Sequence, residues 1–399
     1  MGIAVAVVSP SRGVPSAQYR PELDTLRFFA FLGVFVTHML PGDTAGYARY
    51  HFSPAVVFFF DTIGGIGSFG VDVFFVLSGY LITHLLLQEK RQTATIDLKA
   101  FYVRRILRIW PLYYGFLLVA AFISPYPWRY GLCFALLVGN WMCALHGFPR
   151  PHTAITPLWS VSVEEQFYLT WAWVVHKCSS ARVVFRIAVL LLVLSTILRA
   201  LAWHHGFSVD FVWLSTFTRL DSITAGIMLA VLLNGKSQTF PSVLRPFICV
   251  TGICLLGIAV HIRPVFACSL GALGSVAVFL SFIDRREALG ALRGNAALVY
   301  LGRISFGLYV FHMLVRDAVR SLLAPFYYHV ITLLLTWVAA FGLTVFVASC
   351  SYRWFEQPFL AMKNRFSRLR EAAVPVTQVD IPSALTPALL DQDPQKDFV

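Results

Sequence analysis

Three ionisable residues share one apolar stretch near the N-terminus. Residues 23–40 read LDTLRFFAFLGVFVTHML and contain Asp24, Arg27 and His38. If this stretch is helical, the side chains of Arg27 and His38 lie on one face, roughly 16 Å apart along the axis. Ionisable groups inside a membrane helix are costly, so they are candidates for function. His38 could act as a general base, with Arg27 as a fixed cation on the same helix face.

A second group of polar residues lies at residues 158–168, LWSVSVEEQFY. Glu164 and Glu165 are adjacent, so on a helix they point about 100° apart and only one readily faces the interior. Ser160 and Gln166 flank this surface. We expect a carboxylate here to orient or activate the histidine near the N-terminus. The alternative is a pair of interfacial carboxylates in contact with water.

Two arginines precede Trp110-Pro111 at the start of another apolar stretch. Arg105 and Arg108 are three residues apart and therefore adjacent if helical. Paired guanidinium groups match phosphate oxygens, which favours a nucleotide-like or phosphorylated ligand from the cytoplasm. The alternative is ordinary anchoring of the span by lipid headgroups.

Other polar residues in apolar stretches are also open to structural explanations. Asp72 and Ser78 lie near glycines that allow close helix packing. Arg219 and Asp221 form a charged pair at the start of a span and could be a structural ion pair. His312 is buried by its sequence context, and a lone helical histidine is more often a hydrogen-bonded structural group than a catalyst.

Metal and disulfide chemistry have little support. No grouping of His, Asp and Glu has the spacing of a zinc site. The seven cysteines are odd in number, and no two are spaced as C-x-x-C. We predict no metal site, and we interpret the cysteines as small buried side chains.

The composition is that of a membrane protein. The 399 residues are 58% hydrophobic and 13% charged, whereas a soluble domain carries about 25% charged residues. The formal net charge is +12, but most basic residues flank apolar segments, where orientation and anionic lipid explain them. Membrane lipid is therefore an expected partner, and nucleic acid is not.

Basic residues also predict the topology. Eleven apolar stretches recur along the chain, while basic clusters such as the one in 89–109 favour the cytoplasmic side. With both termini cytoplasmic, the number of crossings must be even. We predict an all-α polytopic transmembrane bundle of about ten spans, with the stretch 131–145, broken at Gly139-Asn140, re-entrant or interfacial. The alternative is eleven spans with one basic cluster on the wrong side.

The two ends of the chain differ from its middle. Residues 1–18 lack the positively charged start of a secretory signal and are predicted to be a flexible cytoplasmic segment. Residues 363–399 are polar and contain proline, which predicts a disordered cytoplasmic tail. Residues 19–362 would form the transmembrane domain.

Taken together, these stretches resemble the acyltransferase-3 family, integral membrane acyltransferases that modify cell-surface glycans and some small glycosylated molecules. The resemblance rests on the Arg-x10-His pattern, on FFVLSG at 74–79, on Arg-x-x-Arg before Trp-Pro, on the WSVSVEEQFY stretch and on SFGLYVFH at 305–312. The closing YRWFEQP at 352–358 is similar to the family's usual end. Each motif is weak alone, but the ordered set covers residues from about 19 to 362.

The resemblance implies an acyl-CoA co-substrate, most often acetyl-CoA, no tightly bound cofactor, and a carbohydrate or glycosylated acceptor. It implies a multi-pass protein of the inner (cytoplasmic) membrane, here in a stand-alone form without a C-terminal hydrolase-like domain. By the family's pattern, His38 would be catalytic, Arg27 would support it, and Glu164 would belong to the catalytic set. The candidate substrate-binding residues are Arg105, Arg108, Asp72, Ser78, Ser160, Glu165, Gln166, Arg219, Asp221 and His312.

The alternative from another functional class is a secondary transporter or flippase for an acylated or lipid-linked sugar. Arginine, histidine and glutamate within the membrane would serve a proton or substrate path equally well. We find no internal repeat of broken helices between the two halves of the sequence, which favours acyl transfer.

Overall fold

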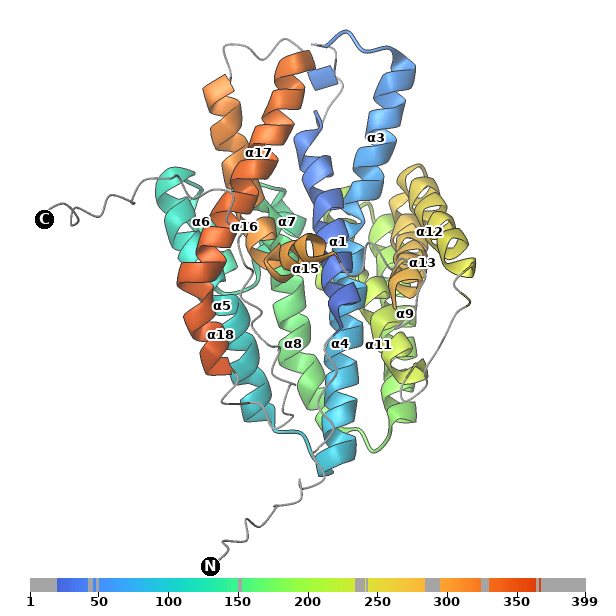
Figure 1. Cartoon of the computed structure of the whole chain (residues 1–399). Helices are drawn as coiled ribbons and strands as arrows, with labels where there is room; N and C mark the ends of the chain where they lie inside the picture. Colours follow the sequence, from blue (N-terminus) through green and yellow to red (C-terminus); the bar gives the residue numbers. More distant parts are fainter. Residues whose placement is uncertain are drawn as a thin grey trace, which may run out of the picture. The chain divides into compact units, whose positions relative to one another are not determined.

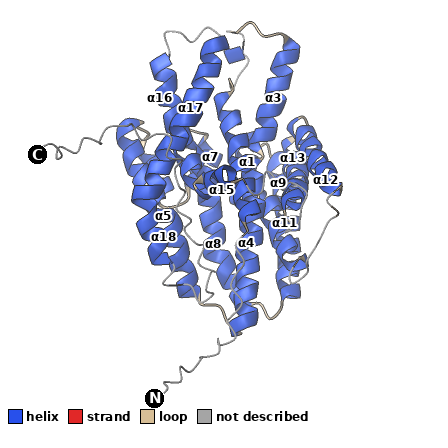
Figure 2. Ribbon diagram, in the orientation of Figure 1, coloured by secondary structure: helices blue, strands red, loops and turns tan. Residues whose placement is uncertain are grey.

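The computed structural model describes residues 20–363 and 366, apart from gaps at 42–45, 48–49, 150–152, 234–240, 242, 284–294, 324–329 and 364–365. Within these residues the fold is helical throughout, without strands (Figure 2). The predicted all-α class is confirmed. The predicted flexible segment 1–18 lies outside the described residues, as does the predicted tail except for Lys363 and Phe366.

Most of the candidate residues lie on helices of the first half of the chain, which Figure 1 shows in blue to green. In chain order they are α1 (Pro21–Met39), α3 (Pro54–Ser68), α4 (Gly70–Thr93), α5 (Leu98–Ile123), α6 (Trp128–Ala135), α7 (Gly139–His146), the 3₁₀ turn η1 (Thr156–Leu158) and α8 (Trp159–Lys177). Two of these helices, α3 and α5, begin with a side-chain cap. The carboxylate of Asp97, for example, accepts from the backbone N–H of Ala100 at 3.0 Å and starts α5.

The second half continues with α9 (Ala181–His204), α10 (Val209–Leu214), the 3₁₀ turn η2 (Thr216–Thr218), α11 (Asp221–Leu232), α12 (Leu244–Val260) and α13 (Pro264–Phe282). The last elements are α15 (Ala296–Arg303), α16 (Ser305–Leu323), α17 (Val330–Ser351), the π-helix η4 (Tyr352–Glu356) and α18 (Gln357–Lys363).

Helix α1 is packed between several partners. It lies against α3, α4, α15 and α16, and the short α15 lies crosswise beside it (Figure 1). Two of these approaches require glycine. A Cβ at Gly70 would collide with the carbonyl oxygen of Ala30, and a Cβ at Gly302 would collide with the backbone of Asp24. The helix that carries Arg27 and His38 is therefore held by backbone contact.

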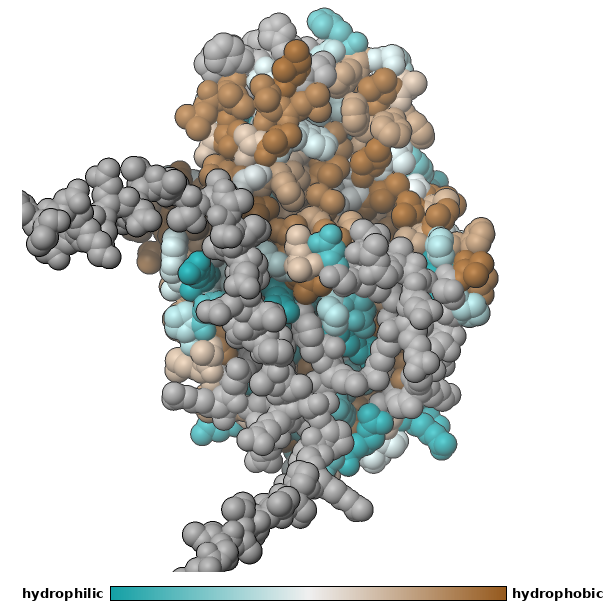
Figure 3. Space-filling view, viewed as in Figure 1, coloured by the Kyte–Doolittle hydropathy of each residue, from teal (hydrophilic) through white to brown (hydrophobic). Residues whose placement is uncertain are grey.

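Several helices have the length and composition of membrane spans. Five helical segments among the described residues are long and apolar enough to cross a membrane. The bent pair α15 and α16, which meet at 73°, would add a sixth. Hydrophobic side chains cover the upper part of the surface in Figure 3, where α3, α16 and α17 lie. The predicted number of ten stays a prediction, since α1 and α8 carry several charged residues and α11 and α12 are shorter.

The stretch 131–145 is broken, as predicted. It contains parts of α6 and α7, which have eight residues each. A helix of this length extends only about 12 Å, less than half of a hydrocarbon core of about 30 Å. The break lies earlier than predicted, at residues 136–138, where Leu137 adopts a left-handed conformation with φ 58°. Gly139 and Asn140 instead begin α7.

Candidate active site

The two histidines singled out from the sequence are in direct contact. Nδ1 of His38, near the C-terminal end of α1, lies 2.9 Å from Nε2 of His312 on α16. The ring centroids are 5.0 Å apart. His312 is 1% exposed, whereas His38 is only partly buried. Nδ1 of His312 lies 2.6 Å from the backbone carbonyl oxygen of Tyr309. One accessible imidazole is thus backed by a buried one.

The same helix also holds the backbone next to His38. Arg316 donates to the carbonyl oxygen of His38 at 3.0 Å, and Arg320 donates to that of Met39 at 2.9 Å. These carbonyls belong to the last turn of α1, where intrahelical partners are lacking and cations are favoured. Sequence reasoning missed both arginines. Arg316 and Arg320 follow His312 at four and eight residues on the same helix face, and this spacing is the signal that could have found them.

Glu164 has a different partner from the one we expected. We expected a carboxylate in this stretch to orient His38, but the group at Nδ1 of His38 is an imidazole. Glu164 instead accepts from the hydroxyl of Ser78 at 2.6 Å. The hydroxyl of Tyr168 lies 2.9 Å from that of Ser78. Helices α4 and α8 thus share one cluster of a carboxylate and two hydroxyls.

Tyr309 links this cluster to the histidines. Its hydroxyl lies 2.7 Å from that of Ser160, one turn before Glu164 on α8. Its ring meets that of Phe74, one turn before Ser78 on α4, edge-on at 6.0 Å. The resulting row of side chains joins α1, α16, α8 and α4, and we call it the polar row: His38, His312, Tyr309, Ser160, Glu164 and Ser78.

Two arginines lie beside the end of the polar row that is distant from His38. The guanidinium of Arg105 is 5.4 Å from the ring centroid of Tyr168 and 5.8 Å from that of Phe101. Arg105 and Arg27 both lie within electrostatic range of Glu164. Arg27 also donates to Asp24, one turn before it on α1, at 2.6 Å. Two cations, Arg105 and Arg27, therefore act on Glu164, and Arg27 is itself paired with Asp24.

Arg108 lies one turn further along α5, within electrostatic range of Arg105. It is also within range of Tyr352 and Glu356 in the π-helix η4. Such π-helical turns are frequent at functional sites. The neighbouring Arg104 is used differently, because it donates to the carbonyl of Phe366 at 2.6 Å.

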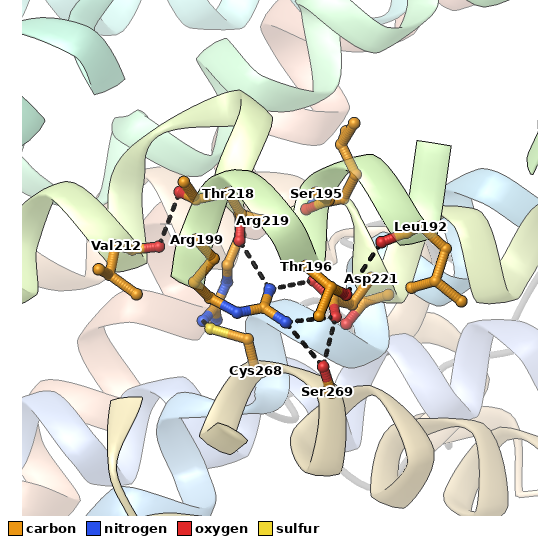
Figure 4. Close-up of polar contacts among 12 residues, drawn as sticks. Leu192, Ser195, Thr196, Arg199, Val212, Thr218, Arg219, Asp221, Cys268 and Ser269 are labelled. Atoms are coloured by element: carbon orange, nitrogen blue, oxygen red, sulfur yellow. Dashed lines mark hydrogen bonds and ion pairs between the residues drawn. The ribbon is translucent and has the colours of Figure 1, made fainter. Parts of the chain in front are cut away.

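Arg219 and Asp221 do not pair with each other as predicted. Arg219 bonds Asp72 at 2.7 Å, and Asp221 receives two bonds from Arg199, at 2.5 and 3.0 Å. Figure 4 shows Arg199 beside Asp221 and Ser269, with Arg219 next to Cys268. We call this group the ion-pair cluster: Asp72, Arg199, Arg219 and Asp221. All four residues are at most 2% exposed.

Two further candidates make contacts that join helices. Trp110 donates to Glu165 at 2.9 Å. The amide of Gln166 donates to Asn140 at 2.8 Å and accepts from Thr216 at 2.6 Å. Gln166 thus connects α8 with the start of α7 and with η2, close to the break in residues 136–138. Neither side chain belongs to the polar row.

The chain is similar to a known protein family and to several curated proteins. A family profile described as an acyltransferase domain matches residues 20–353. The chain is 27% identical to "Putative peptidoglycan O-acetyltransferase YrhL" of Bacillus subtilis, over 88% of this chain and 56% of that protein. It is 26% identical to "Putative O-acetyltransferase SAR0937" of Staphylococcus aureus, over 94% and 63%. It is 25% identical to peptidoglycan O-acetyltransferase OatA of Listeria monocytogenes, over 88% and 57%.

The chain thus spans less than two thirds of the length of each of these curated relatives. No solved structure matches it.

Proposed function

Because this chain belongs to the acyltransferase-3 family, we propose that it is a membrane-bound O-acyltransferase. The reaction would move an acyl group, most simply acetyl, from acyl-CoA to a hydroxyl of a carbohydrate or glycosylated acceptor. The names of the relatives, peptidoglycan O-acetyltransferase among them, support an acetyl group and a cell-surface polymer. The observation that carries the proposal is the partly exposed imidazole of His38 backed by His312.

The chemistry assigned to His38 is general base catalysis. Its imidazole takes the proton of the acceptor hydroxyl as the oxygen attacks the thioester carbon. The new C–O bond forms, the C–S bond breaks, and the proton passes from His38 to the leaving thiolate, giving free CoA. Positioning both substrates beside one base would supply a further large part of the rate enhancement.

Arg105 and Arg108 are the proposed binding residues for the phosphates of the donor. They are adjacent on α5, and within the described part of the chain Arg105 packs on aromatic rings and forms no close ion pair. This leaves its guanidinium donors suited to phosphate oxygens. One end of the polar row lies near Arg105 and the other end is His38, a course that the extended arm of acyl-CoA could follow. The donor would then enter from the cytoplasm, on the positive-inside argument.

Arg27 and Glu164 have a role at a distance from the reacting carbon. Eleven residues of helix separate Arg27 from His38 by about 16 Å, too far for both to contact one tetrahedral intermediate. Arg27, with Asp24 and Glu164, lies instead at the other end of the polar row. We assign Arg27 and Glu164 to holding the donor's arm. The oxyanion beside His38 would rely on backbone donors.

The protein would work in the inner (cytoplasmic) membrane, bound to lipid and without a resident cofactor. Its apolar helices and family membership make it a multi-pass integral membrane protein. The acceptor would reach His38 from the outer side, because the predicted topology places the C-terminal end of α1 there.

The proposal is tested by replacing His38. Purified wild type and His38→Ala, in nanodiscs at equal concentration, are given acetyl-CoA with fragments of peptidoglycan and other surface glycans. The release of free CoA thiol is measured, together with the mass of the acceptor. We expect the variant to lose about 10³-fold or more in kcat, within the range of lost general base catalysis.

The matched control is His261→Ala, which removes an exposed histidine that contacts Thr62. It should leave thiol release unchanged. Full activity of His38→Ala would overturn the role of His38. Movement of a sugar across the membrane by wild type, with no thiol release, would instead support the transporter alternative.

A further inference from the structure

The contacts of His38 and His312 bear on which ring nitrogen of His38 carries the hydrogen. Resting on the proposed role of His38 as the base, we infer that His312 is a positioning residue that selects the tautomer of His38. In the selected form the Nδ1 nitrogen of His38 carries the hydrogen, and the lone pair lies on Nε2. The inference follows from the order of donors and acceptors along three groups.

The order begins at the backbone. The carbonyl oxygen of Tyr309 can only accept, so Nδ1 of His312, 2.6 Å away, must be the donor. A neutral imidazole carries one hydrogen, which leaves Nε2 of His312 as an acceptor. Nδ1 of His38, 2.9 Å from that acceptor, must then be the donor. The lone pair of a neutral His38 is therefore on Nε2, where it can take a proton.

The order requires His312 to be neutral, and its surroundings favour this. The side chain is 1% exposed, and the Phe31 ring meets it edge-on at 5.9 Å. Arg316 lies one turn further along α16, and its cation acts on His312. A second positive charge on a buried ring beside an arginine would be both poorly solvated and repelled.

The arrangement differs from the carboxylate that usually orients a catalytic histidine. A neutral acceptor still holds the ring, and it still stabilises the imidazolium formed when His38 takes a proton. It does so without placing a negative charge beside the base. Arg316 holds the backbone of the same residue, so α16 fixes both the ring and the main chain of His38.

The tautomer can be read directly. The full chain labelled with ¹⁵N-histidine is placed in nanodiscs, and the signals lost in His38→Asn are assigned to His38. We expect wild type to show a protonated Nδ1 and an unprotonated Nε2. In His312→Ala the hydrogen should move toward Nε2. A wild-type His38 that carries its hydrogen on Nε2 would overturn the inference.

Kinetics supply the second measurement. We expect His312→Ala to lower kcat by about 10²-fold or more, with an unchanged KM for acyl-CoA, because the wrong tautomer lacks its base. His312→Gln should recover much of this loss, since its amide oxygen can accept from Nδ1 of His38. Equal losses in both variants would show a packing role and contradict the inference. If His312→Ala fails to fold, the glutamine variant and the wild-type tautomer still decide.

Failure of this inference is distinguishable from failure of the proposed function. An inactive His38→Ala beside a fully active His312→Ala would leave the base in place and remove the positioning role. An active His38→Ala would remove the base itself, and with it any role for His312.

Discussion

The polar row and the ion-pair cluster are two solutions for polar groups in an apolar bundle. In the cluster every charge meets an opposite charge, with Arg219 on Asp72 and Arg199 on Asp221. In the polar row the partners are mostly neutral, such as His312 for His38 and Ser78 for Glu164. Its first imidazole is also partly exposed.

The difference indicates a structural role for the ion-pair cluster and a chemical role for the polar row. A buried ion pair with good geometry is costly to disrupt, and its charges are already neutralised by each other. An accessible base with a neutral partner can gain and lose a proton at low cost. We therefore expect substitutions in the cluster to change mainly stability, and substitutions in the row to change mainly activity.

The largest expected effect is the loss of stability in Asp72→Ala. It leaves Arg219 buried without its anion, which costs about 3–5 kcal/mol in comparable buried pairs. Unfolding in detergent should occur at a clearly lower temperature than in wild type. The double variant Asp72→Leu with Arg219→Met should recover most of the loss, because it removes both charges.

Thr344→Val is the matched control, because Thr344 is a buried residue whose hydroxyl donates within its own helix, to the carbonyl of Ala340 at 2.6 Å. Its effect should be small. A stable Asp72→Ala with reduced activity per folded molecule would restore Asp72 as a substrate-binding residue and weaken the distinction.

Glu164→Gln should produce the reverse outcome. It keeps the shape and the bond from Ser78 but removes the negative charge beside Arg105 and Arg27. We expect a loss of about 10²-fold in kcat/KM, equivalent to one charge-assisted contact in the proposed donor site, with an unfolding temperature close to that of wild type. Ser78→Ala, which keeps the charge, should cost much less. If Glu164→Gln unfolds at a much lower temperature, the carboxylate belongs with the structural pairs.

The smallest effect should come from Arg105→Lys, which keeps the charge but loses the planar guanidinium and its stacking on Tyr168. We expect about a tenfold rise in KM for acetyl-CoA, equivalent to one charge-assisted hydrogen bond. The sharpest measurement uses a second donor, the acetyl thioester of N-acetylcysteamine, which has no phosphates. Wild type and variant should be equal with it. A KM that rises equally for both donors would place Arg105 away from the phosphates.

Local patterns predicted the helices and their polar positions well. The apolar stretch with Arg27 and His38 is one helix, and the stretch 131–145 is broken. Long-range pairing was harder, because a pattern shows which face a residue lies on but not what meets that face. Arg219 and Asp221, two positions apart, therefore suggested a pair, although their partners come from α4 and α9.

The contact between His38 and His312 could not be predicted from local patterns either. It is 274 positions away, and His312 by itself suggested a structural histidine. Arg316 and Arg320 attracted no attention because basic residues near the end of a span have an ordinary explanation. Both arginines donate to carbonyls at the C-terminal end of α1. The fold brings this helix end to α16, and the local sequence around the arginines does not show it.

The bent pair α15 and α16 has a consequence for biosynthesis. Both helices contact α1, α15 through Gly302 near Asp24 and α16 through Arg316 at His38. The ribosome delivers His38 roughly 15–55 s before His312, at about 5–20 residues per second. A nascent chain that has already inserted most of its helices therefore still lacks the support of His38 from α16. On the proposed role of His38, we expect products truncated before His312 to have strongly reduced activity.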